Sequence, residues 1–272
     1  MTNLGSLGIW RASTQVDGAF AAKAERLGYG AVWLGGSPGG DLAIADELLE
    51  ATETLQVATG ILNIWQDTPA SAAKAFHRIE QAHPGRFLLG IGAGHREATA
   101  EYRSPYQALV DYLDALAAEG VPSDRIVLAA LGPKVLRLAA DRTAGAHPYL
   151  TTPEHTRRAR EILGAGPLLA PEQKVVLDAD DTRGRETGRK TVKFYLGLRN
   201  YVANLQRLGY EDADVASPGS DRLIDALAVH GDGDVVAAGV QAHLDAGADH
   251  VVVQALGEDP WPALEAIAQR LL

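Results

Sequence analysis

The chain has 272 residues, of which 46% are hydrophobic, and its formal net charge at pH 7 is −10. It contains no cysteine, which excludes disulfides, thiolate metal sites and cysteine nucleophiles. The acidic balance argues against a nucleic-acid partner, for which a basic face is expected. No run of about eighteen apolar residues could cross a bilayer, and the first residues do not resemble a signal peptide, so we expect a soluble, cytoplasmic protein without a membrane partner.

Short apolar segments with helical patterns between them are predicted to be strands. In chain order they span residues 7–10, 31–34, 57–63, 87–92, 126–131, 145–150, 174–178 and 250–255. Their apolar residues run continuously, which is typical of a parallel sheet buried on both faces. This α/β pattern predicts a closed (β/α)8 barrel of the TIM type, with an open doubly wound sheet as the alternative.

Glycines mark the joints between helix and strand. Gly28, Gly145 and Gly247 each follow a helical pattern and precede a predicted strand. Glycine just past a helix supplies a left-handed cap, so we interpret each as an αβ corner. Residues 180–249 are too long for one connection, and we expect an extended helical insertion of two or three helices before the last strand, one capped by Ser220 or Asp221. The prediction is a single domain over residues 1–272.

Residues 84–95, PGRFLLGIGAGH, form the most informative segment. Glycine weakens a strand, so Gly90, Gly92 and Gly94 indicate that another group approaches the backbone closely here. We expect that group to be a flat ligand. The alternative is a glycine-loosened strand that packs against its neighbours. The spacing is not the dinucleotide fingerprint, because His95 stands where a third glycine would be needed.

Polar and aromatic residues cluster where the predicted strands end, which is the working face of such a barrel. After the fifth strand, Gly132 permits a turn and Pro133 suits the first helical position. The opening amides of that helix attract an anion and Lys134 adds a charge, so the junction is either a phosphate site or merely a helix start.

Histidines and aromatic residues at strand ends are the other candidates. His95 and His147 could hydrogen-bond a cofactor ring or hold a phosphate, although a structural role is the alternative for His147. Trp10, Trp65 and Tyr149 could wall a pocket or simply pack in the core. The motifs of zincins, serine hydrolases and P-loop nucleotidases are absent, and no metal site is predicted.

The motifs PGRFLLGIGAG at 84–94 and LGYGAVW at 27–33 resemble the bacterial luciferase-like family. Within it, the chain looks most like the branch that uses the deazaflavin coenzyme F420, often found in actinobacteria. Residues 58–65, followed by Pro69-Ala70, and residues 242–251 support the resemblance, which covers nearly the whole chain.

The resemblance implies a barrel that holds the deazaflavin at its mouth, with the phosphate after the fifth strand and a non-proline cis peptide joining Gly60 to Ile61 behind the ring. The implied cofactor-binding residues are Gly60, Ile61, Asn63, Ala93, Gly94, His95, Leu131, Gly132, Pro133, Lys134 and His147. Trp10 and Tyr149 are expected to wall the substrate, and His95 is the expected catalytic residue. Some F420-dependent dehydrogenases have a glutamate at the position of His95. Because this chain has no acidic residue there, the acid–base scheme of those enzymes does not apply to it.

The expected function is an F420-dependent oxidoreductase that transfers a hydride to or from a small organic substrate. The rival within the family is an FMN-dependent monooxygenase. A non-catalytic barrel that binds a flavin or a phosphorylated ligand is the alternative from another class. Homodimers are common in the family, so a homodimer is an expected assembly here.

Overall fold

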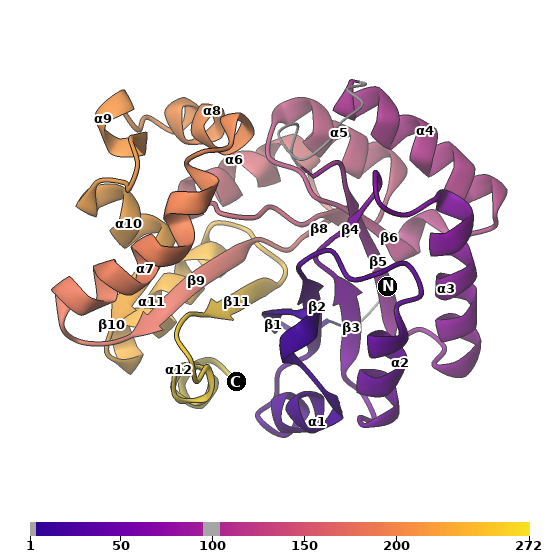
Figure 1. Cartoon of the computed structure of the whole chain (residues 1–272), viewed down its shortest axis with the longest axis horizontal. Coiled ribbons are helices and arrows are strands. Elements are labelled where there is room, and N and C mark those ends of the chain that lie inside the picture. Colours follow the sequence, from indigo (N-terminus) through magenta and orange to yellow (C-terminus); the bar gives the residue numbers. More distant parts are fainter. Residues whose placement is uncertain (1–3, 95–103) are drawn as a thin grey trace.

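The computed structural model describes residues 4–94 and 104–272 (Figure 1). Its first elements are β1 (Leu7–Ala12), α1 (Gly18–Arg26), β2 (Ala31–Gly35), α2 (Ala43–Glu50), β3 (Gln56–Thr59), β4 (Leu62–Asn63), α3 (Pro69–Ala82) and β5 (Phe87–Gly92). They are followed by α4 (Pro105–Ala118), β6 (Ile126–Leu128), α5 (Pro133–Arg142), β7 (Gly145–Ala146), α6 (Pro153–Leu163), β8 (Leu168–Leu169) and β9 (Glu172–Leu177). The last are α7 (Asp181–Tyr195), α8 (Arg199–Arg207), α9 (Asp212–Val215), α10 (Asp221–Leu227), β10 (Ala228–Gly231), α11 (Gly233–Asp245), β11 (Val251–Ala255) and α12 (Trp261–Leu271).

The strands form a curled parallel sheet. Their order is β10-β9-β11-β1-β2-β3-β5-β6-β7-β8, and β4 also pairs with β5. Since β8 and β9 are consecutive parts of one segment, with β8 paired to β7 and β9 paired to β11, the two sides of the sheet meet there. The predicted α/β barrel of the TIM type is therefore confirmed, rather than an open doubly wound sheet.

Both faces of the strands are buried, as their continuous apolar runs predicted. Along β2, Trp33 joins a cluster inside the barrel with Ala58 and Leu88. Its neighbours Val32 and Leu34 belong to the larger core between the strands and the surrounding helices. Side chains of a strand alternate between its two faces, so an all-apolar strand requires apolar partners on each side.

The third predicted strand is interrupted. The structure divides residues 57–63 into β3 and β4 at the peptide bond between Gly60 and Ile61, which is cis, as expected. The predicted strand at 145–150 is shorter, because β7 ends at Ala146 and Pro148 has no N–H to extend a ladder. Similarly, Pro171 separates β8 from β9, so β9 begins two residues before the predicted position 174.

Two of the three predicted corners have the expected geometry. Gly28 and Gly247 follow α1 and α11 with φ of 90° and 99°, in the left-handed region that favours glycine. Gly145 differs, because it is the first residue of β7 rather than a helix cap. A Cβ there would lie 2.0 Å from the carbonyl oxygen of Leu168, so the close pairing with β8 is what requires glycine.

The insertion holds more elements than predicted. Four helices, α7 to α10, come before β10 and α11, and they lie together on the left of Figure 1. Gly197 and Gly209 divide α7 from α8 and α8 from α9, which explains why two or three longer helices do not form. Ser220 caps α10 as expected, with its hydroxyl accepting a hydrogen bond from the Leu223 amide at 3.2 Å. β10 is an additional strand, too short and too polar to be recognised.

Helices α7 to α10 have a small apolar cluster of their own. Val192, Leu205 and Ile224 are buried in it, and Leu150, which follows β7, connects it to the barrel. That the insertion and the barrel form one domain stays a prediction. In residues 4–94 and 104–272, none of the helices has the length and hydropathy to cross a membrane.

Candidate functional site

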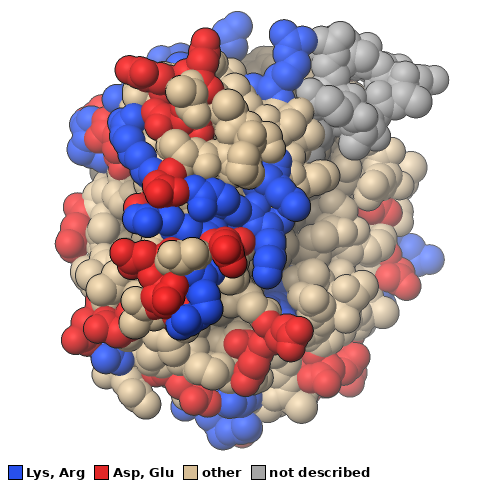
Figure 2. Space-filling view, turned by 60° about the vertical axis from the view of Figure 1, so that its left-hand side comes forward, with Lys and Arg blue, Asp and Glu red and all other residues tan. Residues whose placement is uncertain are grey.

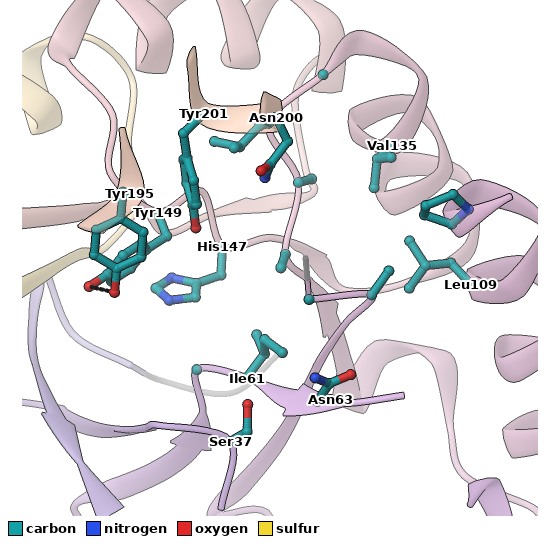
Figure 3. A pocket seen from close by; sticks show the side chains of 18 of the residues that line it. Ser37, Ile61, Asn63, Leu109, Val135, His147, Tyr149, Tyr195, Asn200 and Tyr201 are labelled. Carbon is teal, nitrogen blue, oxygen red and sulfur yellow. Dashed lines mark hydrogen bonds between the residues drawn. The ribbon is translucent and has the colours of Figure 1, made fainter. Parts of the chain in front are cut away.

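A cavity of about 710 Å³ opens at the carboxyl ends of the strands (Figure 3). Its volume falls in the range of about 300–1,000 Å³ that is usual for ligand pockets. Strand ends and the loops after them contribute Trp10, Gly36, Ser37, Gly60, Ile61, Asn63, Gln66, Ala93, Gly94, Ala129, Ala130, Leu131, Gly132, His147 and Tyr149. Helices α4, α5, α7 and α8 contribute Pro105, Leu109, Val135, Phe194, Tyr195, Arg199, Asn200, Tyr201 and Arg207.

The site therefore gathers most of the residues predicted for it. Gly60, Ile61, Asn63, Ala93, Gly94, Leu131, Gly132 and His147 line one cavity together with Trp10 and Tyr149. Pro133 and Lys134 are exposed and do not line it. Trp65 does not line it either, because its indole donates to the carbonyl oxygen of Ala93 at 2.6 Å. His95 lies outside the described residues.

The floor of the cavity is the backbone between β3 and β4. The indole nitrogen of Trp10 donates to the carbonyl oxygen of Gly60 at 3.0 Å, which fixes this turn. A Cβ on Gly60 would come within 3.2 Å of His147 Nε2 and 3.3 Å of Trp10 Nε1, so a side chain would crowd both rings. Glycine here keeps the floor flat.

His147 lines the cavity beside this floor. Its ring packs on Trp33 with centroids 4.4 Å apart, and its Nδ1 bonds the carbonyl oxygen of Ala170 at 2.7 Å. Burial lowers its pKa to about 4, so the ring is neutral and Nδ1 carries the proton. Nε2 is then an acceptor, and it is buried without a hydrogen-bond partner in the described part of the chain. A neutral, unpaired acceptor at a cavity suits a ligand that donates an N–H or O–H.

Tyr149 forms the aromatic side of the cavity. Its ring lies 5.5 Å from that of Trp10, and its hydroxyl bonds both the Tyr195 hydroxyl and Gln254 Oε1 at 2.9 Å. Because Tyr149 donates to Gln254, it accepts from Tyr195. Burial raises the pKa of Tyr149 well above its ordinary value, so the phenol stays protonated.

A buried ion pair supports this wall. Lys174 Nζ lies 2.9 and 3.0 Å from the two carboxylate oxygens of Glu172, and both side chains are at most 1% exposed. The ammonium group also lies 3.9 Å from the ring centroid of Tyr149. Burial lowers the pKa of Lys174 and raises that of Glu172, while their mutual attraction opposes both shifts.

Two of the glycines of β5 are explained by packing and not by the approach of a flat ligand, which was the main expectation. A Cβ on Gly90 would lie 1.8 Å from the carbonyl oxygen of Thr59, and one on Gly92 would lie 2.9 Å from Ala129 and Ile61 side-chain atoms. The protein's own strands approach these two glycines, so the packing alternative holds for them. Gly94, with φ of 56°, does line the cavity.

Sequence reasoning missed the contribution of the insertion. Tyr195, Arg199, Asn200, Tyr201 and Arg207, from α7 and α8, close the cavity opposite the strand ends. Figure 3 shows Asn200 and Tyr201 above the space that Ile61 and Asn63 bound from below. The aromatic density of residues 194–201 was the available signal, but nothing in the pattern says that these helices fold back over the barrel.

Several buried histidines predict acid sensitivity. Burial lowers the pKa of His147 and His250 to about 4 and that of His243 to about 3, from an ordinary 6.5. Below pH 6.5 these histidines bind protons in the unfolded chain but stay neutral in the folded chain. Their contribution to the free energy of unfolding is therefore fully present above pH 6.5 and is lost as the pH falls toward 4. At about 1.4 kcal/mol per pKa unit, His147 and His250 each contribute up to about 3 kcal/mol to this loss, and His243 contributes up to about 5 kcal/mol because its loss continues to pH 3.

We therefore expect urea unfolding to give a clearly lower free energy of unfolding at pH 5 than at pH 7.5. His77 is exposed, so His77→Gln is a matched control that should leave the slope unchanged. A free energy that stays constant over this interval would contradict the prediction.

Comparison with known proteins supports the resemblance. The family model for luciferase-like monooxygenases matches residues 17–119. A 5,10-methylenetetrahydromethanopterin reductase from Archaeoglobus fulgidus is 23% identical over 276 aligned positions, which cover 81% of this chain and 83% of that protein.

Solved structures share the fold. An F420-dependent secondary alcohol dehydrogenase in complex with an F420-acetone adduct superimposes with a TM-score of 0.76 at 15% identity, covering 97% of each chain. The oxygenating constituent of 3,6-diketocamphane monooxygenase from Pseudomonas putida, in complex with FMN, gives a TM-score of 0.65 at 17% identity and covers 98% of this chain and 99% of the other. The resemblance of this chain to the luciferase-like monooxygenase family is therefore confirmed.

Proposed function

We propose that the protein is an F420-dependent oxidoreductase, which transfers a hydride between deazaflavin F420 and a small organic substrate. The relative and one of the structural neighbours described above are a reductase and an F420-dependent dehydrogenase. The observation that carries the proposal is the flat floor at Gly60 and Ile61 with the unpaired acceptor His147 Nε2 beside it.

The residues of the cavity fit a planar cofactor ring. The floor carries no side chain at Gly60, and a Cβ there would meet His147 and Trp10 at the limit of contact. The orphaned Nε2 of His147 matches a ring that presents an N–H. The aromatic surfaces of Trp10 and Tyr149 offer apolar area beside this floor.

When bound, F420 gives or takes a hydride at a carbon of its central ring. The protein would bind the cofactor and orient it toward the substrate. Gly60 and Ile61 would support the ring, and Trp10 and Tyr149 would border the space left for the substrate. The hydroxyl chain from Tyr195 through Tyr149 to Gln254 keeps this wall in place. His95 stays our prediction for a hydrogen bond to the ring or to the charge that develops on the substrate.

An FMN-dependent monooxygenase is the second candidate, and the FMN-bound neighbour favours it. Deazaflavin lacks the ring nitrogen at which flavins form their oxygen adduct, so the choice of cofactor decides between hydride transfer and oxygen insertion. A non-catalytic barrel would bind a ligand without turnover.

The purified protein is expected to quench F420 fluorescence on titration and to bind FMN at least about tenfold more weakly, a difference of about 1.4 kcal/mol. Tight FMN binding without F420 binding would assign the monooxygenase function instead. If neither molecule binds, the enzymatic proposal itself fails.

We also infer the cellular location, the assembly and the source of the protein. The composition supports a cytoplasmic protein that acts on small molecules rather than on nucleic acid, and the resemblance supports a homodimer and an actinobacterial source. Size-exclusion chromatography with light scattering tests the assembly.

A further inference from the structure

In the described part of the chain, the charged residues that line the cavity have one sign. Arg199 and Arg207, both on α8, line it, and among the described lining residues there is no aspartate or glutamate. The whole chain carries a net charge of −10. Basic residues without acidic ones among the described lining raise the local concentration of anions in an acidic protein and favour a negatively charged ligand.

In the part of the chain that the structure describes, the two guanidinium groups also lack acidic partners. Over residues 4–94 and 104–272, no carboxylate lies within 4.0 Å of either one. On neighbouring α7, by contrast, Arg183, Arg185 and Arg189 each pair with an aspartate. Figure 2 shows such interleaved positive and negative side chains over the face that carries the insertion. The unpaired state of the α8 arginines is therefore not the rule in this region.

Arg207 lines the cavity together with Leu131 and Gly132, which come directly before α5. The Nε2 atom of His155 bonds the carbonyl oxygen of Leu131 at 2.9 Å, and the positive charge of Arg207 adds to the effect of burial in lowering the pKa of His155. Arg158 donates to the Arg207 carbonyl oxygen at 2.8 Å and holds this end of α8. The side chains of Arg207 and Lys134 are both exposed, but Arg207 lines the cavity together with Gly132 and Lys134 does not, so Arg207 is the cation that borders the predicted anion site.

Arg199 lies at the other end of α8. Eight residues separate it from Arg207, which at 1.5 Å per residue is about 12 Å along the helix. A ligand with two separated anionic groups can use both arginines, each through charge-assisted hydrogen bonds.

We propose that α8 recognises the acidic tail of the cofactor, with Arg207 and the start of α5 binding the phosphate and Arg199 binding a carboxylate beyond it. This inference rests on the proposed function. F420 carries a phosphodiester followed by glutamyl carboxylates, whereas FMN ends in a single phosphate. Two cations at opposite ends of α8 therefore suit the longer, polyanionic tail better than a single phosphate.

The test compares two probes by fluorescence titration. One is F420, and the other is its deazaflavin fragment that lacks the phosphate and the glutamyl tail. Arg207→Gln and Arg199→Gln are each expected to weaken F420 binding about tenfold, and to leave binding of the fragment unchanged. Arg137→Gln is the matched control, because Arg137 is exposed on α5 and does not line the cavity.

The outcomes separate this inference from the proposed function. If the double variant binds F420 as tightly as the wild type, or if fragment binding weakens as much as F420 binding, the tail assignment is overturned. If the wild type binds neither probe, the proposed function fails first. Raising NaCl from 50 to 500 mM should weaken F420 binding by the wild type more than by the double variant.

Discussion

Replacing Lys174 by methionine is expected to lower the free energy of unfolding by about 3–5 kcal/mol. The ammonium group is fully buried and lies within 3.0 Å of both carboxylate oxygens of Glu172. Without it, the buried carboxylate keeps, among the residues that the structure describes, the hydrogen bond from the Leu150 amide at 3.1 Å. An uncompensated charge in the interior is among the most costly defects a single substitution produces.

The double variant Glu172→Gln/Lys174→Met is the control, because it removes both charges and keeps similar volumes. It should recover much of the loss, since a buried pair contributes little net stability once its desolvation is counted. Urea unfolding at pH 7.5 measures both. A single variant within about 1 kcal/mol of the wild type would show that the pair is solvated or that Glu172 is already neutral.

The barrel was predictable because its signals are local. Continuous apolar strands, and the glycines at 28 and 247 that turn the chain after a helix, report on short segments and need no knowledge of distant contacts. The division of the insertion into four helices was less accessible. It depends on Gly197 and Gly209, and a single glycine within a helical pattern does not by itself end a helix.

The candidate site also contains residues that local sequence signals predicted and residues that they did not. Gly60, Asn63, Gly94 and His147 were found because strand ends of a parallel barrel converge on one face. Arg199 and Arg207 were not, because their place in the cavity depends on how α8 packs over the barrel, which no periodicity encodes. Lys134 was proposed from its position beside Gly132, yet a side chain at the second position of a helix can point to solvent, and this one does.

The largest steric effect is expected for Gly90→Ala. Its added Cβ would lie 1.8 Å from the carbonyl oxygen of Thr59, which belongs to the backbone of β3 and cannot rotate away. Thr59 also donates its hydroxyl hydrogen to the Gly90 carbonyl oxygen at 2.7 Å, so the two strands are held together at this point. The substitution must separate β3 from β5 just before the floor of the cavity at Gly60.

We expect Gly90→Ala to lose at least about 3 kcal/mol of unfolding free energy, at or beyond the upper end for overpacking a core. Gly39→Ala is the matched control, because a Cβ at Gly39 meets nothing within 4 Å and its φ is not positive. Thermal and urea unfolding measure both variants. If Gly90→Ala were as stable as Gly39→Ala, the contact with Thr59 would not explain the glycine, and approach by a ligand would again be the better account of this strand.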